Sequence, residues 1–244
     1  RRFREALDSG AEAFGWSDRP GPCERREGEW LIGYGMASAA RGNALMESQA
    51  RVILTPDGRA RVETDMTDIG TGTYAILGQI AGEMLGLPRD AVDVVLGDTD
   101  LPPASGSGGS WGAASSGTSV YLACQAIRRQ LAARLDMGET DLTLKDGQVT
   151  YANRTRPLTE VLNGDEIAKV GHIEPGKTSD AVRQATFGAY FAEVAVHAAS
   201  GETRLRRMHG SFAAGRILNA KTARSQCLGG MIFGIGMALT EELA

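Results

Sequence analysis

The sequence predicts an α+β fold in which mixed sheets pack against helices. One observation is a series of β-hairpin signals, in which alternating runs are joined by short turns such as Asp146-Gly147. A second is a pair of strand–loop–helix units with glycine-containing loops, whose helices are expected at residues 73–86 and 118–135. An order that mixes hairpins with strand–helix units is typical of the α+β class.

The composition is that of a globular protein with an excess of glycine. Of the 244 residues, 42% are hydrophobic and 23% are charged, which allows a core in one large domain or two small ones. The 32 glycines indicate tight turns and close approach of the backbone to ligands. A formal net charge of -4 argues against a nucleic-acid partner, which usually selects a basic surface. No apolar run reaches membrane-spanning length, so we expect no membrane span.

The three cysteines and three histidines are scattered along the chain, and no Cys-x-x-Cys occurs. This spacing predicts neither a disulfide framework nor a zinc site, so we expect no metal ligand from the protein. The chain opens on RRFREAL, without Met and without the apolar middle of a signal peptide. We therefore expect it to be part of a longer protein.

The first 64 residues carry a helix pattern and then extended segments. Apolar residues at helical spacing predict a helix over residues 1–14, and a polar stretch with two prolines predicts a connector over residues 17–28. A glycine-punctuated extended segment follows at residues 30–40. Residues 50–54 and 59–64 are expected to form a hairpin, because the intervening TPDG has strong turn chemistry.

Two glycine-containing loops precede the central helices. DMTDIGTG lies at residues 65–72, a short β-branched strand is expected at residues 92–96, and SGSGGSWGAASSG lies at residues 105–117. We expect the second run to be too rich in Gly and Ser to pack in a core. Its bare backbone and the following helix start suit an anionic ligand, although a flexible linker is the alternative. The two units could bring both loops to one side of a sheet.

The second half predicts two more hairpins and a terminal helix. The hairpins pair residues 142–145 with 148–151 and residues 187–197 with 202–212, and residues 157–174 read as a short helix and an exposed loop. Residues 220–243 form a helix pattern that is apolar nearly all round, so we expect a buried core helix, with a membrane helix as the alternative.

These patterns divide the chain into three segments. They are an N-terminal helix and connector (1–28), a first cofactor-binding α+β subdomain (29–140), and a second α+β subdomain that ends in the buried helix (141–244).

Three stretches are candidates for holding one anionic cofactor. They are residues 69–72, the loop around residues 109–113, and residues 216–226, where Asn219 is a good helix N-cap. Arg216 and Lys221 would place positive charge near that helix start, and Gln226 could bond the edge of a heterocycle. The alternative for the third stretch is an ordinary capped helix end. Neither a complete dinucleotide fingerprint nor a P-loop is present.

Four aspartates lie in the loops beside these stretches: Asp65, Asp68, Asp98 and Asp100. They could be metal ligands or an acid/base pair. We favour turn and cap residues, because each lies where Asp prefers to bond the local backbone.

Three long stretches resemble the molybdopterin-binding large subunit of the xanthine oxidase family. They are TDMTDIGTGTYAILGQIAGEMLG (64–86), LGDTDLPPASGSGGSWGAASSGTSVYLACQ (96–125) and AAGRILNAKTARSQCLGGMIFGIGMALTEEL (213–243). The resemblance is nearest to the bacterial periplasmic aldehyde oxidoreductase branch, which uses molybdopterin cytosine dinucleotide. It covers nearly all of this chain but only a portion of the family's large subunit. It implies a molybdopterin-binding fold of mixed sheets with packed helices.

The resemblance implies a set of cofactor-binding residues and no catalytic residue in this chain. The pterin loop would be Ile69, Gly70 and Thr71, where the wider family has Gln in place of Thr71. Gly109 would approach the molybdenum through its backbone, and Gly112 and Ala113 match cofactor-loop positions. Gln226 would bond the cofactor close to the metal. The dinucleotide phosphates would be held by Arg216, Ile217, Leu218, Asn219, Ala220, Lys221 and Thr222.

The resemblance also implies the substrate class, the electron acceptors and the partner subunits of the parent protein. The parent would oxidise an aldehyde or N-heterocycle with water as the oxygen source, and electrons would pass to 2Fe–2S centres and FAD on an iron–sulfur subunit and a FAD subunit. The family's catalytic Glu, in a Val-Gly-Glu motif, would lie downstream of Ala244, so we expect this chain alone to be inactive. A cofactor-free binding or assembly module is the alternative function. The resemblance leaves the compartment open between periplasm and cytoplasm.

Overall fold

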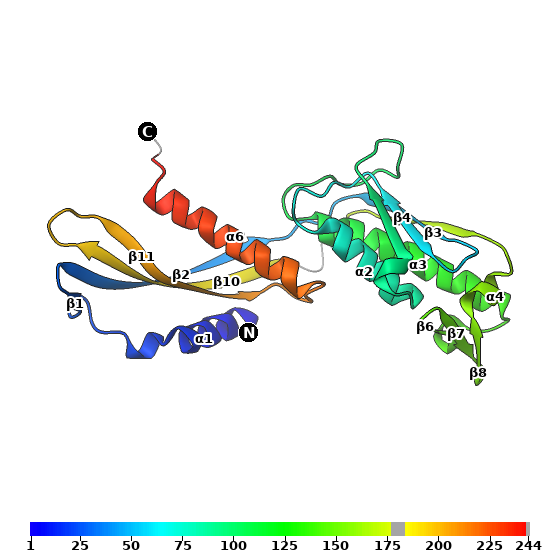
Figure 1. Ribbon diagram of the computed structural model, residues 1–244, viewed down its shortest axis with the longest axis horizontal. Helices are drawn as coiled ribbons and strands as arrows, with labels where there is room; N and C mark the ends of the chain where they lie inside the picture. The colour runs from blue at the N-terminus through cyan, green and yellow to red at the C-terminus, as the bar shows by residue number, and fades with distance from the viewer. Residues whose placement is uncertain (177–183, 243–244) are drawn as a thin grey trace. The chain divides into compact units, whose positions relative to one another are not determined.

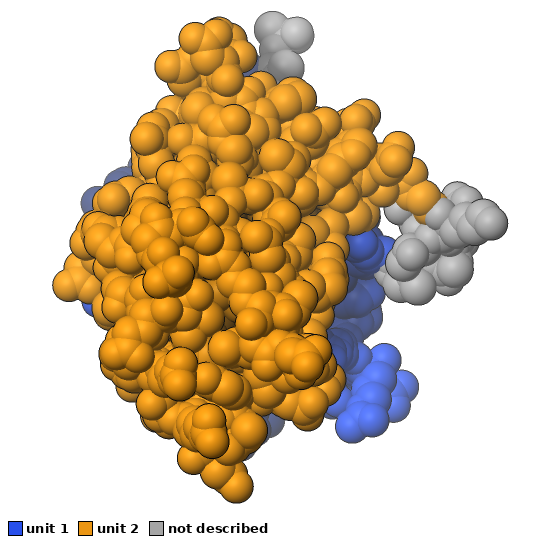
Figure 2. Space-filling view, turned by 90° about the vertical axis from the view of Figure 1, so that its right-hand side faces the viewer, with its two compact units in different colours: residues 1–42, 184–244 blue, residues 43–183 orange. Residues whose placement is uncertain are grey.

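The structure, a computed structural model, describes residues 1–176 and 184–242. Two compact units can be distinguished, residues 1–42 with 184–244 and residues 43–183 (Figure 2). These units do not follow the three segments expected from the sequence. The first unit joins both ends of the chain, because the strand after residue 29 pairs with a strand that begins at Ala185.

The first unit is an antiparallel sheet with a helix along one face. Its strands run in the order β1 (Arg26–Glu27), β2 (Trp30–Gly42), β10 (Ala185–His197) and β11 (Thr203–Ala213). Helix α1 (Arg2–Phe14) packs on β10 and β11, as Figure 1 shows. The rings of Phe14 and Phe191 stack with centroids 5.7 Å apart, and both side chains are almost fully buried. The apolar stripe that predicted α1 therefore faces the sheet.

Helix α6 (Ala220–Leu239) also belongs to the first unit and contacts β11. The prediction that this helix is buried is wrong, because none of its described residues is buried. Ile232 and Phe233 are 67% and 68% exposed. A helix that is apolar all round needs cover on every side, whereas the strand β11 can cover only one. The membrane alternative is not supported either: among the described helices, none combines the length and the apolar character that crossing a membrane requires.

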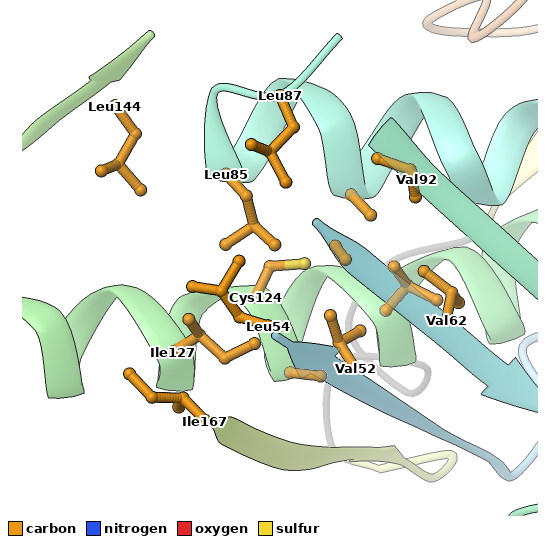
Figure 3. Close-up of a cluster of buried hydrophobic side chains, with 14 of the residues drawn as sticks. Val52, Leu54, Val62, Leu85, Leu87, Val92, Cys124, Ile127, Leu144 and Ile167 are labelled. Carbon is orange, nitrogen blue, oxygen red and sulfur yellow. The ribbon is translucent and has the colours of Figure 1, made fainter. Parts of the chain in front are cut away.

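The second unit is built on a mixed sheet in the order β5 (Val92–Leu96), β4 (Ala60–Thr64), β3 (Ser48–Leu54) and β9 (Ile167–Ile173). Strands β4 and β5 are parallel and are joined through α2 (Thr73–Leu85), while the other pairs are antiparallel. The long helix α3 (Gly112–Arg134) packs on β3, β9 and α2. Figure 3 shows the resulting core, where Leu54, Ile127 and Ile167 meet from β3, α3 and β9.

A small three-stranded sheet completes this unit. Its strands are β6 (Thr143–Lys145), β7 (Gln148–Tyr151) and β8 (Arg154–Pro157), followed by the short helix α4 (Leu158–Leu162). Positive φ angles of 50° at Asp146 and 70° at Gly147 confirm the predicted type I′ turn. Three short 3₁₀ turns lie at Trp16–Asp18, Arg89–Ala91 and Glu139–Asp141.

All three predicted hairpins are present, and their registers confirm the predicted pairings. The α+β class is confirmed as well. Strand β9 was missed, since residues 157–174 were expected to form a short helix and an exposed loop. Its sequence, IAKVGHI, carries exposed Ala168, Val170 and His172 between residues that face the sheet core. Only the pairing with β3, more than a hundred residues earlier, makes it a strand.

Candidate functional site

The two glycine-containing loops of the second unit lie against each other. The hydroxyl of Thr67 donates to the Ser107 hydroxyl at 2.7 Å, and the Ser107 hydroxyl donates to the Thr67 carbonyl at 2.6 Å. The loop entering residues 105–117 is also bonded along the sheet, since Asp65 N–H donates to the Pro102 carbonyl at 2.9 Å. The Asp65 carboxylate in turn accepts from the Ala104 N–H. The expectation that both loops share one side of the sheet is confirmed.

The start of α2 is held by the carboxylate of Asp68. One carboxylate oxygen accepts from the N–H groups of Gly70 and Gly72 at 2.9 and 3.2 Å, and the other accepts from Tyr74 N–H at 3.2 Å. Partial burial acts to raise the pKa of Asp68, but the backbone N–H bonds from Gly70, Tyr74 and Gly72 outweigh it and lower the pKa overall. The helix start therefore already holds a negative charge, so it has little attraction left for a phosphate.

Asp98 also bonds the local backbone through its carboxylate. The Asp98 carboxylate accepts from the N–H of Asp100 at 2.9 Å, closing a turn. The interpretation as turn and cap residues is thus confirmed for Asp68 and Asp98, whereas the Asp65 carboxylate instead bonds the distant Ala104 N–H and ties the two loops together. Within residues 1–176 and 184–242, no group of three His, Cys, Asp or Glu side chains could hold a metal ion.

The pterin-loop candidates are open to a ligand. Ile69 is 70% exposed, and Gly70, at φ 99°, has no atom within 4 Å of the place where a side chain would begin. This turn exposes backbone, and the carboxylate beside it is already bonded by backbone N–H groups. It suits an uncharged ring that stacks or hydrogen-bonds against it.

The Gly- and Ser-rich run differs from what we expected, because its second half is helix. Residues 112–117 are the first turns of α3, and Ser115 and Ser116 are fully buried. The expectation that this composition cannot pack in a core is therefore wrong. The serine hydroxyls find partners on β3 and the segment before it: Ser116 bonds the Ser48 hydroxyl at 3.0 Å, and Ser115 accepts from Met46 N–H at 3.0 Å. Ser119 donates to the Ser48 carbonyl at 2.7 Å.

The candidate residues of this run have different exposures. Gly109 and Ala113 are exposed, while Gly112 is buried against the Met66 side chain, which joins the two loops. The Trp111 ring lies where a side chain on Gly109 would be and donates its N–H to the Ser105 carbonyl at 3.1 Å. The Ser105 hydroxyl is buried and has no hydrogen-bond partner among the described residues. Such a group is usually satisfied by a ligand or by water.

Ser105, Thr67 and Asp68 are the residues of this site that the sequence reasoning did not assign to the cofactor. Nothing in the sequence distinguishes Ser105 from its neighbouring serines, because only the folded loop reveals a hydroxyl without a partner. Asp68 did carry a signal, since an Asp shortly before a helix pattern is a common N-cap.

The third candidate stretch is in the first unit, at the start of α6. The Asn219 side-chain oxygen accepts from the N–H groups of Lys221 and Thr222, each at 3.0 Å, so the predicted N-cap is confirmed. Arg216, Ile217, Leu218, Ala220 and Lys221 are exposed, Asn219 and Thr222 are half-buried, and Gln226 is exposed on the second turn. The cap here is a neutral amide, and the charges around it are positive. This helix start, unlike that of α2, remains attractive to a phosphate.

The candidate residues therefore form two groups. Those of residues 69–71 and 109–113 lie together in the second unit, and those of residues 216–226 lie together in the first. The first group is an uncharged, glycine-lined surface and the second is a basic helix start.

Comparison with known proteins identifies relatives along the whole chain. The chain is 48% identical over 245 residues to the aldehyde oxidoreductase molybdenum-binding subunit PaoC of Escherichia coli, covering 100% of this chain and 34% of that protein. It is 29% identical over 256 residues to the 6-hydroxypseudooxynicotine dehydrogenase complex subunit gamma of Paenarthrobacter nicotinovorans, covering 99% and 32%. The chain thus spans about a third of the length of these relatives.

Solved structures share the fold. Quinoline 2-oxidoreductase from Pseudomonas putida 86 matches with a TM-score of 0.82 at 22% identity, covering 100% of this chain and 34% of that one. The aldehyde oxidoreductase from Desulfovibrio desulfuricans matches with a TM-score of 0.76, also at 22% identity, covering 98% and 26%. The family model of the molybdopterin cofactor-binding domain matches residues 9–244. This chain therefore belongs to the molybdopterin cofactor-binding domain family.

Proposed function

We propose that this chain holds molybdopterin cytosine dinucleotide in a molybdenum hydroxylase that oxidises an aldehyde or an N-heterocycle with water as the oxygen source. When bound, the molybdenum centre accepts the two electrons of the oxidation. The residues of this chain bind and orient the cofactor, and we assign none of them a catalytic role. On this proposal the 244 residues alone bind without turnover.

The proposal of a dinucleotide rests on the contrast between the starts of helices α2 and α6. The α2 start is neutralised by the Asp68 carboxylate, so the loop at Ile69, Gly70 and Thr71 suits the pterin ring. The α6 start is capped by the neutral Asn219 amide and is surrounded by basic residues, so residues 216–222 suit the pyrophosphate.

The loop around residues 109–113 and Gln226 would orient the pterin and the metal end. Gly109, Gly112 and Ala113 would bring backbone close to the ligand. Gln226 would bond the cofactor near the metal through its side-chain amide. On this proposal the pterin would hold the metal, and none of these residues would ligate it.

Electron acceptors are proposed on partner subunits. Relatives are named as a molybdenum-binding subunit and as a subunit of a dehydrogenase complex. An iron–sulfur subunit and a FAD subunit would carry electrons from the molybdenum centre. Iron, flavin and two further polypeptides should therefore co-purify with the tagged full-length protein, and a single colourless polypeptide would refute this part of the proposal.

The main test is cofactor analysis of the purified full-length protein. Molybdenum, pterin fluorescence after denaturation and cytidine monophosphate after acid hydrolysis are expected in equal amounts. Absence of all three would favour the cofactor-free assembly module. Molybdenum and pterin without the nucleotide would keep the enzyme class and reject the dinucleotide form.

Two variants test the assigned residues. Gln226→Ala should lower turnover without changing the thermal midpoint, and Gln130→Ala on α3 is its control. Arg216→Glu should lower cofactor content through charge repulsion with the pyrophosphate, whereas Arg129→Glu makes the same charge change at an exposed site of α3. Full cofactor occupancy in Arg216→Glu would contradict the placement of the phosphates.

A further inference from the structure

The side chain of Trp111, the N-cap residue of α3, holds the loop of residues 105–111 at two places. Its indole N–H donates to the Ser105 carbonyl at 3.1 Å, where the loop begins. Its ring lies against two glycines near the end of the loop. The first carbon of an added side chain would be 3.0 Å from the ring at Gly108 and 1.9 Å from it at Gly109. Indole combines a large apolar surface with one donor, so a single residue makes both contacts.

The backbone of this loop adopts conformations that its own sequence does not enforce. The φ angles of Gly106 and Gly109 are 68° and 45°, and that of Ser110 is 57°. The left-handed region is open to glycine but disfavoured for serine. Three of the six residues 105–110 are glycine, so the loop has many alternative conformations when nothing holds it. Contacts made by side chains must therefore select the turn that is observed.

Trp111 and Ser107 make these contacts at different places. The Ser107 hydroxyl fastens the middle of the loop to Thr67, whereas Trp111 fastens the start of the loop to its end. The indole ring covers the side of Gly109 from which a side chain would leave, and Gly109 is otherwise exposed. A ligand can therefore approach the Gly109 backbone only from the side that the ring leaves open.

We propose that Trp111 is a positioning residue for the cofactor, which fixes the Gly109 backbone in the conformation that the metal end of the cofactor requires. This inference rests on the proposed function, which puts the metal end beside Gly109. A loop that is held in its binding conformation before the ligand arrives binds more tightly, because the cost of ordering it is already met. A loop that keeps this conformation for only about a tenth of the time binds about tenfold more weakly.

Replacement of the indole in the full-length protein tests the inference. Trp111→Ala should lower molybdenum and pterin content by about tenfold. Trp111→Phe should lower both by only about threefold, because its ring still covers the glycines and only the bond to the Ser105 carbonyl is lost. Trp30→Ala is the matched control and should leave loading unchanged, since the Trp30 ring packs edge-on to His197 in the first unit, with centroids 5.1 Å apart.

Two measurements separate positioning from a general loss of stability. In the cofactor-free full-length protein, Trp111→Ala should speed amide exchange across residues 105–111 by about tenfold and leave the thermal midpoint unchanged. In protein labelled with fluorotryptophan, the fluorine resonance that disappears in Trp111→Phe should shift when the cofactor is loaded, because the ring contacts Gly109.

A methyl group on Gly109 tests the contact from the other side. Gly109→Ala should lower loading, because its methyl carbon would lie 1.9 Å from the indole ring and displace it. This loss should shrink when Gly109→Ala is combined with Trp111→Ala, since the strain at φ 45° is common to both backgrounds and only the clash is removed. If Trp111→Ala does not fold, Gly109→Ala still decides, and it should also abolish the fluorine shift.

Loading equal to wild type in Trp111→Ala, or in Gly109→Ala, would overturn the inference while leaving the cofactor assignment intact. Independent, multiplying losses in the double variant would overturn it as well, because the ring would then not act through Gly109. A wild-type protein without molybdenum, pterin or nucleotide would instead overturn the proposed function.

Discussion

Replacing Asp68 with alanine should open the turn before α2. The variant loses three backbone N–H bonds to one carboxylate, from Gly70, Gly72 and Tyr74. Loss of a single N-cap side chain typically costs about 1 kcal/mol and at most about 2 kcal/mol. Because the freed N–H groups lie where water can reach them, we expect a loss of about 2 kcal/mol and no more. That corresponds to a roughly 30-fold larger equilibrium constant for opening of this segment.

Hydrogen exchange of the segment around residues 68–76 measures this change directly at neutral pH. Asp68→Asn should be milder, because its amide oxygen can still accept from Gly70 and Gly72. Asp98→Ala is the control, since it removes a single N–H bond in an exposed turn and should change stability by less than about 0.5 kcal/mol. Equal exchange in wild type and Asp68→Ala would refute the role given to the carboxylate.

The stability difference between wild type and Asp68→Ala should change with pH in a definite direction. The pKa of Asp68 is lowered in the folded chain, despite partial burial, by its bonds to backbone N–H groups. Its contribution is therefore complete above the unfolded pKa of about 3.9 and is lost as the pH falls through the lower folded pKa. The difference between wild type and Asp68→Ala should shrink in strongly acidic solution. A difference that grows as the pH falls would contradict this.

Three further outcomes are expected. Gly171→Ala should lower the urea midpoint by an amount equivalent to about 1–3 kcal/mol, because its new methyl group would lie 1.9 Å from the Ser119 carbonyl oxygen; an unchanged midpoint would show that α3 and β9 can separate freely. Asn219→Ala should speed amide exchange in the first turn of α6 and cost about 1 kcal/mol, with unchanged exchange as the contrary result. Burial raises the pKa of the Cys124 thiol to about 12, so this thiol should react with alkylating agents only on unfolding. The exposed Cys23 should react at once. Fast labelling of Cys124 in the native protein would contradict its burial.

Features with a local cause could be predicted from the sequence. The TPDG and Asp146-Gly147 turns specify their hairpins, because their conformations are available to few other residue pairs. The caps at Asp68 and Asn219 are likewise set within a few residues of the helix that they begin. The long quoted stretches also predicted the family correctly, and the family model confirms it.

Features that depend on distant partners could not be predicted. Strand β9 exists because it pairs with β3, and the division into units follows from the pairing of β2 with β10. The sequence predicted the helix from residue 118 but missed the first turns of α3, residues 112–117, because the low helix propensity of Gly and Ser predicts a loop. Hydroxyl bonds to Ser48 offset that propensity, and they are visible only in the folded chain.

The serine contacts between α3 and β3 also restrict how α3 can move. An apolar interface is indifferent to small sliding, because hydrophobic attraction has no preferred direction. A hydroxyl bond such as that of Ser119 to the Ser48 carbonyl loses strength steeply when its angle changes. Sideways drift or rotation of the first turns of α3 would therefore break several bonds at once. Gly112 and Ala113 lie in these first turns, so the same bonds hold their backbone in place against the sheet.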